Sequence, residues 1–152
     1  MNTVHSLVTF ALDSQRYALY LSAVERVIRA VEITCLPKAP DIVAGVINVQ
    51  GRIIPVVDIR KRFGLPQREI ALSDQLIIAR TSKRPVAMIV DAVQGVIKYS
   101  EEMLIPANEI VHGIRYVDGI VKLRDGMVLI HDLEKFLSLK EKRSLDRAMA
   151  QA

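Results

Sequence analysis

The chain of 152 residues contains no tryptophan, one cysteine and few aromatic residues, which make up 5% of its composition. The single cysteine, Cys35, excludes an intramolecular disulfide and gives no cysteine-based metal cluster. Its apolar neighbours predict a buried thiol. No apolar run approaches the roughly 20 residues that a membrane-spanning helix requires, and the first residues lack the pattern of a signal peptide. The sequence therefore predicts a cytoplasmic protein that is not inserted in the membrane.

Motifs for catalysis and nucleotide binding are also missing. The sequence contains none of the patterns GxxxxGK[ST], GxGxxG, HExxH and GxSxG. Its three histidines, His5, His112 and His131, lie far apart, and none has metal-ligand spacing to another His, Cys or carboxylate. We therefore expect a protein that binds other molecules rather than an enzyme, with no cofactor and no metal.

Basic residues exceed acidic ones, at 21 Lys and Arg against 17 Asp and Glu, and the isoelectric point is near 9.4. Much of the excess lies in two short runs, 60–64 and 140–147. This charge leaves open an alternative of another class, a basic β-barrel that binds nucleic acid. However, basic and aromatic residues do not alternate as they do on base-stacking surfaces. Solvated faces of helices or loops are the simpler explanation, so no nucleic acid is expected.

Aliphatic residues are abundant, and they follow one pattern that occurs twice. A shift of 69 positions places YALYLSAVERVI (17–28) on VAMIVDAVQGVI (86–97), with five identities in twelve positions. A shift of 74 places GVINVQGRIIPVVDI (45–59) on GIVKLRDGMVLIHDL (119–133). Two copies are too few for a solenoid, which needs at least about three stacked repeats. The chain thus has two similar halves, and we expect the function to use both.

Short runs of β-branched residues, separated by turn residues, predict five strands in each half. Five short twisted strands tend to close into a small barrel, because closure removes exposed edges. Gln50-Gly51 and Asp125-Gly126 stand where hairpins need residues with positive φ, so Gly51 and Gly126 are predicted to be structural. The expected strands are 7–12, 17–21, 27–33, 43–49 and 53–57, then 75–80, 85–90, 95–100, 117–123 and 127–130.

Helices are expected to be short, except for a C-terminal helix from Leu133 to about Met149. Asp58 and Asp132 each follow the fifth strand of a half, where their carboxylates can cap a helix in IRKRF or LEKFL. A hydrolase or transferase that uses these two carboxylates is the alternative from a different class, and capping is the simpler explanation.

The predicted fold is all-β with minor α content. It consists of two pseudo-symmetric five-stranded barrels, of the small SH3-like kind, packed together within a single domain over 1–152. The first barrel is expected near 6–65, with part of the C-terminal helix, and the second near 74–137. Strand exchange between the halves is left open.

The segment LPKAPDIVAGVINVQGRIIPVVDIRKRFGL (36–65) resembles the signature of the CheW family, and the resemblance extends over about 6–139. CheW proteins are the coupling proteins that join a CheA-type histidine kinase to chemoreceptors in bacterial chemotaxis. The resemblance implies two five-stranded barrels, in agreement with the strand count, and a non-enzymatic adaptor. A CheW-like scaffold of a non-motility chemosensory pathway is the variant that it leaves open.

The resemblance also implies the partners. The groove between the barrels takes the cytoplasmic tip of a methyl-accepting receptor, and the second barrel meets the regulatory domain of the kinase. Further CheW-like copies can join in rings, and the protein is recruited to membrane-bound receptor arrays. Val93 is assigned to kinase binding. The expected groove residues are Val24, Val27, Ile28, Gly45, Val46, Asn48 and Gln50.

For the aliphatic members of this set, ordinary core packing is the alternative, and Gly45 fits a bent barrel strand. One position departs from the family pattern, which has Arg in N-x-R-G where this chain has Gln50. Glutamine lacks the charge and the forked donors of arginine, and a lost charge-assisted contact is worth about 1.5–3 kcal/mol. Arg52 is a candidate substitute, and Arg124 is the basic residue at the matching position of the second half. A plain hairpin role for Gln50 is the alternative.

Overall fold

The computed structural model describes residues 4–106 and 116–151, and the chain there is mainly β-structure. All ten expected strands are present in these ranges, and a short strand, β9, is added. The strands are β1 (Val4–Leu12), β2 (Gln15–Tyr20), β3 (Val24–Arg29), β4 (Val43–Val49), β5 (Arg52–Val57), β6 (Gln75–Arg80), β7 (Pro85–Val90), β8 (Ala92–Ser100), β9 (Leu104–Pro106), β10 (Val117–Leu123) and β11 (Gly126–His131). The helices are α1 (Arg60–Phe63) and α2 (Leu139–Ala150), and 3-10 turns cover Leu21–Ala23 and Glu101–Met103.

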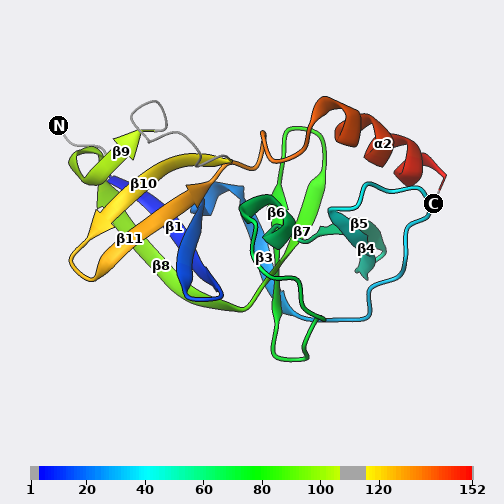
Figure 1. Cartoon of the computed structure of the whole chain (residues 1–152), viewed down its shortest axis with the longest axis horizontal. Helices are drawn as coiled ribbons and strands as arrows, with labels where there is room; N and C mark the ends of the chain where they lie inside the picture. Colours follow the sequence, from blue (N-terminus) through cyan, green and yellow to red (C-terminus); the bar gives the residue numbers. More distant parts are fainter. Residues whose placement is uncertain (1–3, 107–115, 152) are drawn as a thin grey trace.

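The strands form two sheets, which occupy the left and right lobes of the molecule in Figure 1. The six-stranded sheet has the order β8-β1-β2-β11-β10-β9, and the five-stranded sheet has the order β3-β6-β7-β5-β4. The predicted mostly-β fold with two similar parts, short helices and a C-terminal helix is confirmed, and the two expected barrels correspond to sheets of six and five strands. One sheet has six strands rather than five because β9 pairs with the edge of β10.

Each sheet takes strands from both halves of the chain. The six-stranded sheet combines β1 and β2 with β8–β11, whereas the five-stranded sheet combines β3–β5 with β6 and β7. The expected ranges of the barrels, 6–65 and 74–137, therefore do not match the sheets, and the pairing shows the strand exchange that the sequence left open. Neither sheet can form from one half alone, because each half lacks strands that the other supplies.

The strand exchange follows the internal repeat, because repeat-related strands pair in the same way in both sheets. Val56 of β5 pairs in parallel with Ala87 of β7, and Ile130 of β11 pairs in parallel with Ala18 of β2. The shifts of 74 and 69 relate these positions to one another. The same parallel pair thus occurs once in each sheet. In the five-stranded sheet the first half supplies β5 and the second half supplies β7, whereas in the six-stranded sheet the second half supplies β11 and the first half supplies β2.

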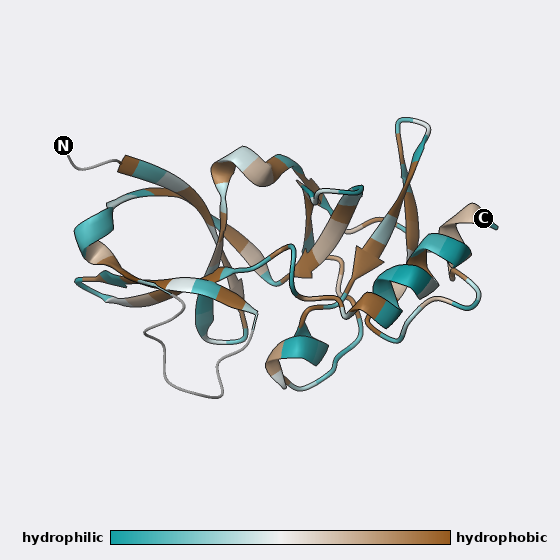
Figure 2. Cartoon of the chain, turned by 90° about the horizontal axis from the view of Figure 1, so that it is seen from above, coloured by the Kyte–Doolittle hydropathy of each residue, from teal (hydrophilic) through white to brown (hydrophobic). Residues whose placement is uncertain are grey.

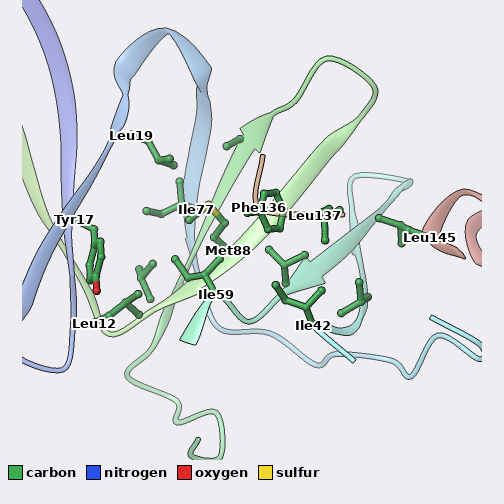
Figure 3. Packing of buried hydrophobic residues seen from close by; sticks show 14 of the residues in the cluster. Leu12, Tyr17, Leu19, Ile42, Ile59, Ile77, Met88, Phe136, Leu137 and Leu145 are labelled. Carbon is green, nitrogen blue, oxygen red and sulfur yellow. The ribbon is translucent and has the colours of Figure 1, made fainter. Parts of the chain in front are cut away.

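Central strands are buried on both faces, which explains their continuous aliphatic runs. Leu76 and Ile78 of β6 belong to a cluster inside the five-stranded sheet, whereas Ile77 and Ala79 pack into a cluster between the two sheets. We call the latter the shared cluster. Figure 3 shows it extending from Leu12, Tyr17 and Leu19 through Ile77 and Met88 to Phe136, Leu137 and Leu145.

The C-terminal helix begins at Leu139, six residues later than expected, and LEKFL forms a turn. Phe136 and Leu137 are buried in the shared cluster before the helix starts. Ser138 and Glu141 then form a capping box, with N···O distances of 3.1 Å to Ser138 Oγ and 2.9 Å to Glu141 Oε1. In Figure 2, α2 alternates between hydrophilic and hydrophobic residues, as expected for a helix that buries one face.

Candidate partner-binding surface

A network of charges around the buried Arg60 joins the two sheets. Arg60 is only 3% exposed, and its guanidinium donates to Asp13 Oδ1 at 2.8 Å and to Asp91 Oδ1. Asp13 lies in the turn between β1 and β2, and Asp91 lies between β7 and β8. Arg68 extends the network, since its Nη2 lies 2.6 Å from oxygens of both Asp74 and Asp91. The first basic run is therefore not a solvated face, because its Arg60 stabilises the junction.

Two carboxylates of this network, those of Asp74 and Asp91, are favoured in their ionised form. Burial opposes the ionisation of Asp91, but hydrogen bonds from Arg60, from the Asp13 backbone N–H and from Arg68 outweigh it and hold the Asp91 pKa below its usual value. The hydrogen bond from Arg68 lowers the pKa of Asp74, against the effect of burial. Ion pairs thus connect both sheets and the 64–74 linker at neutral pH.

The second basic run is divided between contacts and solvent. Lys142 Nζ donates to the Glu134 carbonyl at 2.9 Å, and Asp146 accepts from Lys83 and from Arg84. Arg143 and Arg147 are exposed on the outer face of α2. A solvated face is thus present at these last two positions.

The predicted aliphatic site residues lie around the junction between the sheets. Val24, Val27, Val46 and Val93 are half-buried and pack against the shared cluster. Ile28 follows Val27 on β3 but packs against the cluster inside the five-stranded sheet. The structure thus brings the four valines to one cluster and places Ile28 on the other face of its strand.

Two hydrogen bonds connect β4 to the segment that follows β3. Thr34 N donates to the Val46 carbonyl at 2.9 Å, and Val46 N donates to the Thr34 carbonyl at 2.7 Å. Val93, by contrast, lies at the start of β8, and its N–H donates to Gln75 Oε1 of β6 at 2.7 Å. These contacts place Val46 near the continuation of β3 and make Val93 a direct link between the sheets.

Gly45 has a structural reason to be glycine. A Cβ there would lie 2.3 Å from the Thr34 carbonyl oxygen and 2.7 Å from Ile33 Cγ2, and the backbone φ is 152°. The repeat-related Gly119 is less constrained, because a Cβ there would lie 2.7 Å from the tip of the Leu104 side chain and 3.2 Å from the Ile105 carbonyl oxygen. Both glycines stand at a register shift in their hairpins. At Gly45, the backbone of a second segment passes too close to the strand for a side chain.

Asn48 and Gln50 belong to the hairpin between β4 and β5. Asn48 Oδ1 accepts a hydrogen bond from Gly51 N at 2.8 Å. Gln50 and Gly51 have φ values of 51° and 86°, as a tight hairpin turn of the primed type requires. The Gln50 side chain is exposed, so the structure gives this residue the plain hairpin role and leaves its side chain available to a partner.

The hairpin of the second half differs by one residue from the prediction. Its turn is formed by Arg124 and Asp125, and Gly126 is the first residue of β11, with a φ of 141°. Positive φ is thus found at both predicted glycines, Gly51 and Gly126. Arg124 and Asp125 are exposed at the tip.

Arg52, the candidate substitute for the missing family arginine, is held by an acidic residue. Its Nη2 donates to Glu25 Oε2 at 2.8 Å, while Arg80 Nε donates to Glu25 Oε1 at 2.9 Å. These two hydrogen bonds lower the pKa of Glu25 to about 2. The three residues belong to a hollow of about 530 Å³, which we call the arginine hollow and which is lined by Ser22, Val24, Glu25, Arg26, Arg52 and Arg80.

Asp58 and Asp132 bind backbone N–H groups. Asp58 Oδ1 accepts from Arg60 N at 3.1 Å, and Asp132 Oδ1 accepts from Glu134 N at 2.9 Å and Lys135 N at 3.2 Å. Each carboxylate therefore stabilises the turn that follows its strand, although the N-cap position of α1 itself is Ile59. This backbone role is the one expected from their positions.

His131 is packed rather than placed for acid–base chemistry. It is 2% exposed, with the Phe63 and Phe136 rings each 5.5 Å from its own, and neither ring nitrogen has a hydrogen-bond partner among the residues that the structure describes. Burial lowers its pKa to about 3. Cys35 is exposed, contrary to the expectation of a buried thiol. His112 lies outside the described residues.

Over residues 4–106 and 116–151, no group of three or more His, Cys, Asp or Glu residues could hold a metal ion. In the same part of the chain, no helix is both long and apolar enough to cross a membrane. The described residues thus form two joined sheets. Ion-paired side chains and half-buried valines surround the junction between them.

Comparison with known proteins identifies this architecture. A profile of the CheW-like domain matches residues 6–141, which is most of the chain. The chain belongs to the CheW family. The chemotaxis protein CheW of Thermotoga maritima is 34% identical over 131 residues, which cover 86% of each chain. The CheW protein of Bacillus subtilis is 29% identical over 146 residues, which cover 95% of this chain and 94% of that one.

The fold of this CheW-family chain also matches a solved structure. The crystal structure of the scaffolding protein TtCheW from Thermoanaerobacter tengcongensis has a TM-score of 0.82 and 32% sequence identity, covering 91% of this chain and 96% of that one. The predicted family, its role as a chemotaxis coupling protein and its non-enzymatic character are therefore confirmed.

Sequence reasoning missed two charged groups of this CheW-family protein. The network around Arg60 and the cluster around Glu25 connect residues that are distant in the chain: Asp13 to Arg60 spans 47 positions, and Glu25 to Arg80 spans 55. One sequence contains no signal for such pairs. Gln50, which stands where the family pattern has Arg, pointed to Arg52 as a substitute but not to its contacts with Glu25 and Arg80.

Proposed function

We propose that this CheW-family protein couples the cytoplasmic tip of a methyl-accepting chemoreceptor to the regulatory domain of a CheA-type histidine kinase. It acts in the cytoplasm, within receptor arrays at the membrane. The observation that carries the proposal is the CheW-like match over 6–141. The similarity to a scaffolding CheW protein over nearly the whole chain supports it.

The duplicated architecture suits a protein with two partners. Apart from β9, the two sheets arrange their repeat-related strands in the same order. They differ in the side chains at repeat-related positions, such as Gln50 and Arg124. On our proposal, the receptor's helical hairpin docks beside Val24, Val27 and Val46, with Ile28, Gly45, Asn48 and Gln50 nearby, in the manner of a helix bound in a groove. The kinase contacts the side of Val93. Similar backbones with different side chains thus give one chain two distinct surfaces.

The junction between the sheets then transmits the signal. The shared cluster and the ion pairs of Arg60 hold the sheets in one arrangement. A change in the receptor can therefore alter kinase activity only through differential contacts with a common scaffold. No chemical step in this protein is required.

Titration calorimetry with a purified kinase regulatory domain and with a receptor hairpin fragment tests the proposal directly. We expect each partner to bind with a dissociation constant of roughly 1–50 μM, which corresponds to about 6–8 kcal/mol. Absence of binding to both partners at several times this concentration would contradict the proposed function.

The variant Gln50→Arg tests whether the hairpin contacts a partner. Because the side chain is exposed, a restored arginine can gain at most about 1 kcal/mol, or roughly fivefold in affinity. We expect a gain for the receptor fragment, measured by calorimetry at low salt. The matched control is Gln50→Ala. Equal affinities of the wild type and the arginine variant for both partners would show that this hairpin position is not a contact.

A further inference from the structure

Among residues 4–106 and 116–151, the arginine hollow holds more positive than negative charge. Its lining includes three arginines, Arg26, Arg52 and Arg80, but one carboxylate, that of Glu25, which leaves an excess of two positive charges. Within the described part of the chain, the guanidinium groups of Arg52 and Arg80 each donate from one nitrogen to Glu25, and their other guanidinium nitrogens make no hydrogen bond to the protein. An arginine has five N–H donors, so most of the donors in the hollow are unused.

Glu25 also orders the two arginines. Its side chain is 16% exposed, whereas those of Arg52 and Arg80 are 50% and 71% exposed. The carboxylate therefore anchors two solvent-facing guanidiniums that come from different strands, β5 and β6. Such anchoring reduces the conformational entropy that is lost when the guanidiniums bind a further anion. A guanidinium pairs best with a carboxylate or phosphate, through two parallel hydrogen bonds.

The surroundings favour a protein carboxylate over nucleic acid. Binding to nucleic acid needs a basic track along several phosphates. Arg60 and Arg68, in contrast, are tied to carboxylates in the junction. The lining of the hollow has no aromatic ring for base stacking but includes the half-buried Val24. An acidic group beside an apolar one is the complement that such a surface requires.

From these observations we propose that the arginine hollow binds acidic side chains of the receptor's helical hairpin. This step rests on the proposed function for the identity of the partner. Glutamates at positions i and i+4 lie on one face of a helix and are within reach of two neighbouring guanidiniums. The hollow then supplies the charge-assisted contact that the missing arginine at position 50 would otherwise provide.

The decisive experiment compares two double variants that lose the same charge. One is Arg52→Gln with Arg80→Gln in the hollow, and the other is Arg143→Gln with Arg147→Gln on the exposed face of α2. With a labelled receptor hairpin fragment at about 0.1 M salt, we expect binding to weaken about tenfold for the hollow variant and less than twofold for the α2 variant. Thermal unfolding confirms that both variants are folded.

Equal weakening by the two double variants overturns the proposal, because it would reflect net charge alone. An unchanged affinity of the hollow variant also overturns it, while leaving the coupling function intact. If the wild type does not bind the receptor fragment at all, the proposed function fails instead, and the hollow is tested with a simpler probe.

That probe is an alanine-based helical peptide with glutamates at i and i+4, matched by a peptide with glutamines. We expect the glutamate peptide, at millimolar concentration, to shift the side-chain Nε–H resonances of Arg52 and Arg80, and the glutamine peptide to leave them in place. Shifts that a single-stranded oligonucleotide produces at lower concentration than the glutamate peptide overturn the assignment in favour of nucleic acid. Absence of shifts with the glutamate peptide overturns carboxylate binding altogether.

Discussion

Among single residues, the buried His131 has the clearest expected effect on how the stability of this protein depends on pH. It packs against Phe63 and Phe136, and its ring nitrogens have no hydrogen-bond partner in the described part of the chain. Burial depresses its folded-state pKa from 6.5 to about 3. Below pH 6.5 the unfolded chain therefore takes up a proton that the folded protein excludes. The free energy of unfolding then falls by about 1.4 kcal/mol per pH unit until the pH approaches the folded-state pKa.

The variant His131→Val tests this assignment, since Val57 occupies the repeat-related buried position. Between pH 7.5 and pH 5, the wild type is expected to lose about 2 kcal/mol of stability through His131, and the valine variant is expected to lack that loss. Urea unfolding at the two pH values measures it. His5→Gln is the control, because the His5 side chain is 36% exposed. A valine variant that keeps the full loss would refute the assignment.

Among the elements, α2 depends on tertiary contacts for its position. The sequence pattern from Leu133 onward is compatible with a longer helix, but Phe136 and Leu137 are buried in the shared cluster in a non-helical turn. The helix begins only where Ser138 and Glu141 cap it. Leu145 and Ala148 then attach it to the protein by burial. The helical pattern thus predicted the element, and packing decided where it begins.

Leu145→Ala is expected to lower the free energy of unfolding by about 2–4 kcal/mol, because it opens a cavity in the shared cluster. Leu139→Ala is the matched control on the same helix, since Leu139 is 64% exposed. Its effect should stay within about 0.5 kcal/mol. Urea denaturation measures both variants. Similar losses for both would mean that α2 is stabilised by its helical propensity rather than by docking.

For the whole molecule, the exchange of strands and the Arg60 network have the same consequence. Both join parts of the chain that are far apart in sequence, and both cross from one sheet to the other. A receptor bound to one sheet and a kinase bound to the other would therefore share a single connected scaffold. This connection is the property that the proposed coupling function needs most.

Arg60→Met removes the guanidinium while keeping a long apolar side chain. We expect a loss of about 1.5–3 kcal/mol, because the variant removes the ion pair of Asp13 and one of the two ion pairs of Asp91, which keeps Arg68, and because both carboxylates are partly exposed. Calorimetric unfolding at pH 7 measures it. The depressed Asp91 pKa gives this interaction a pH signature: it is fully present above the unfolded pKa of 3.8 and is lost as the pH falls through the lower folded-state value.

A matched variant separates the loss of the ion pairs from the effect of placing a methionine in α1. Lys61→Met alters the neighbouring residue of α1, which is exposed and donates to the Asp41 carbonyl. It should cost less than about 1 kcal/mol. If Arg60→Met is equally mild, the charged network does not hold the sheets together.

Many secondary-structure elements of this protein could be predicted from its sequence, because they depend on local properties. Strand runs, hairpin glycines and the two-fold repeat depend on neighbouring residues, so all ten expected strands are present and positive φ occurs at Gly51 and Gly126. The family signature at 36–65 is also local, and it led to the function. The boundaries of β3 were less accurate: it spans Val24–Arg29, whereas the strand was expected at 27–33.

The sequence by itself thus determined which elements form, that they occur twice, and to which family they belong. Only the tertiary structure decided which half supplies each strand, that Arg60 and His131 are buried, and that Glu25 gathers Arg52 and Arg80 into one hollow. The physical reason is separation along the chain. Periodicity and turn chemistry act over a few residues, whereas sheet pairing and ion pairs depend on contacts between residues that only folding brings together.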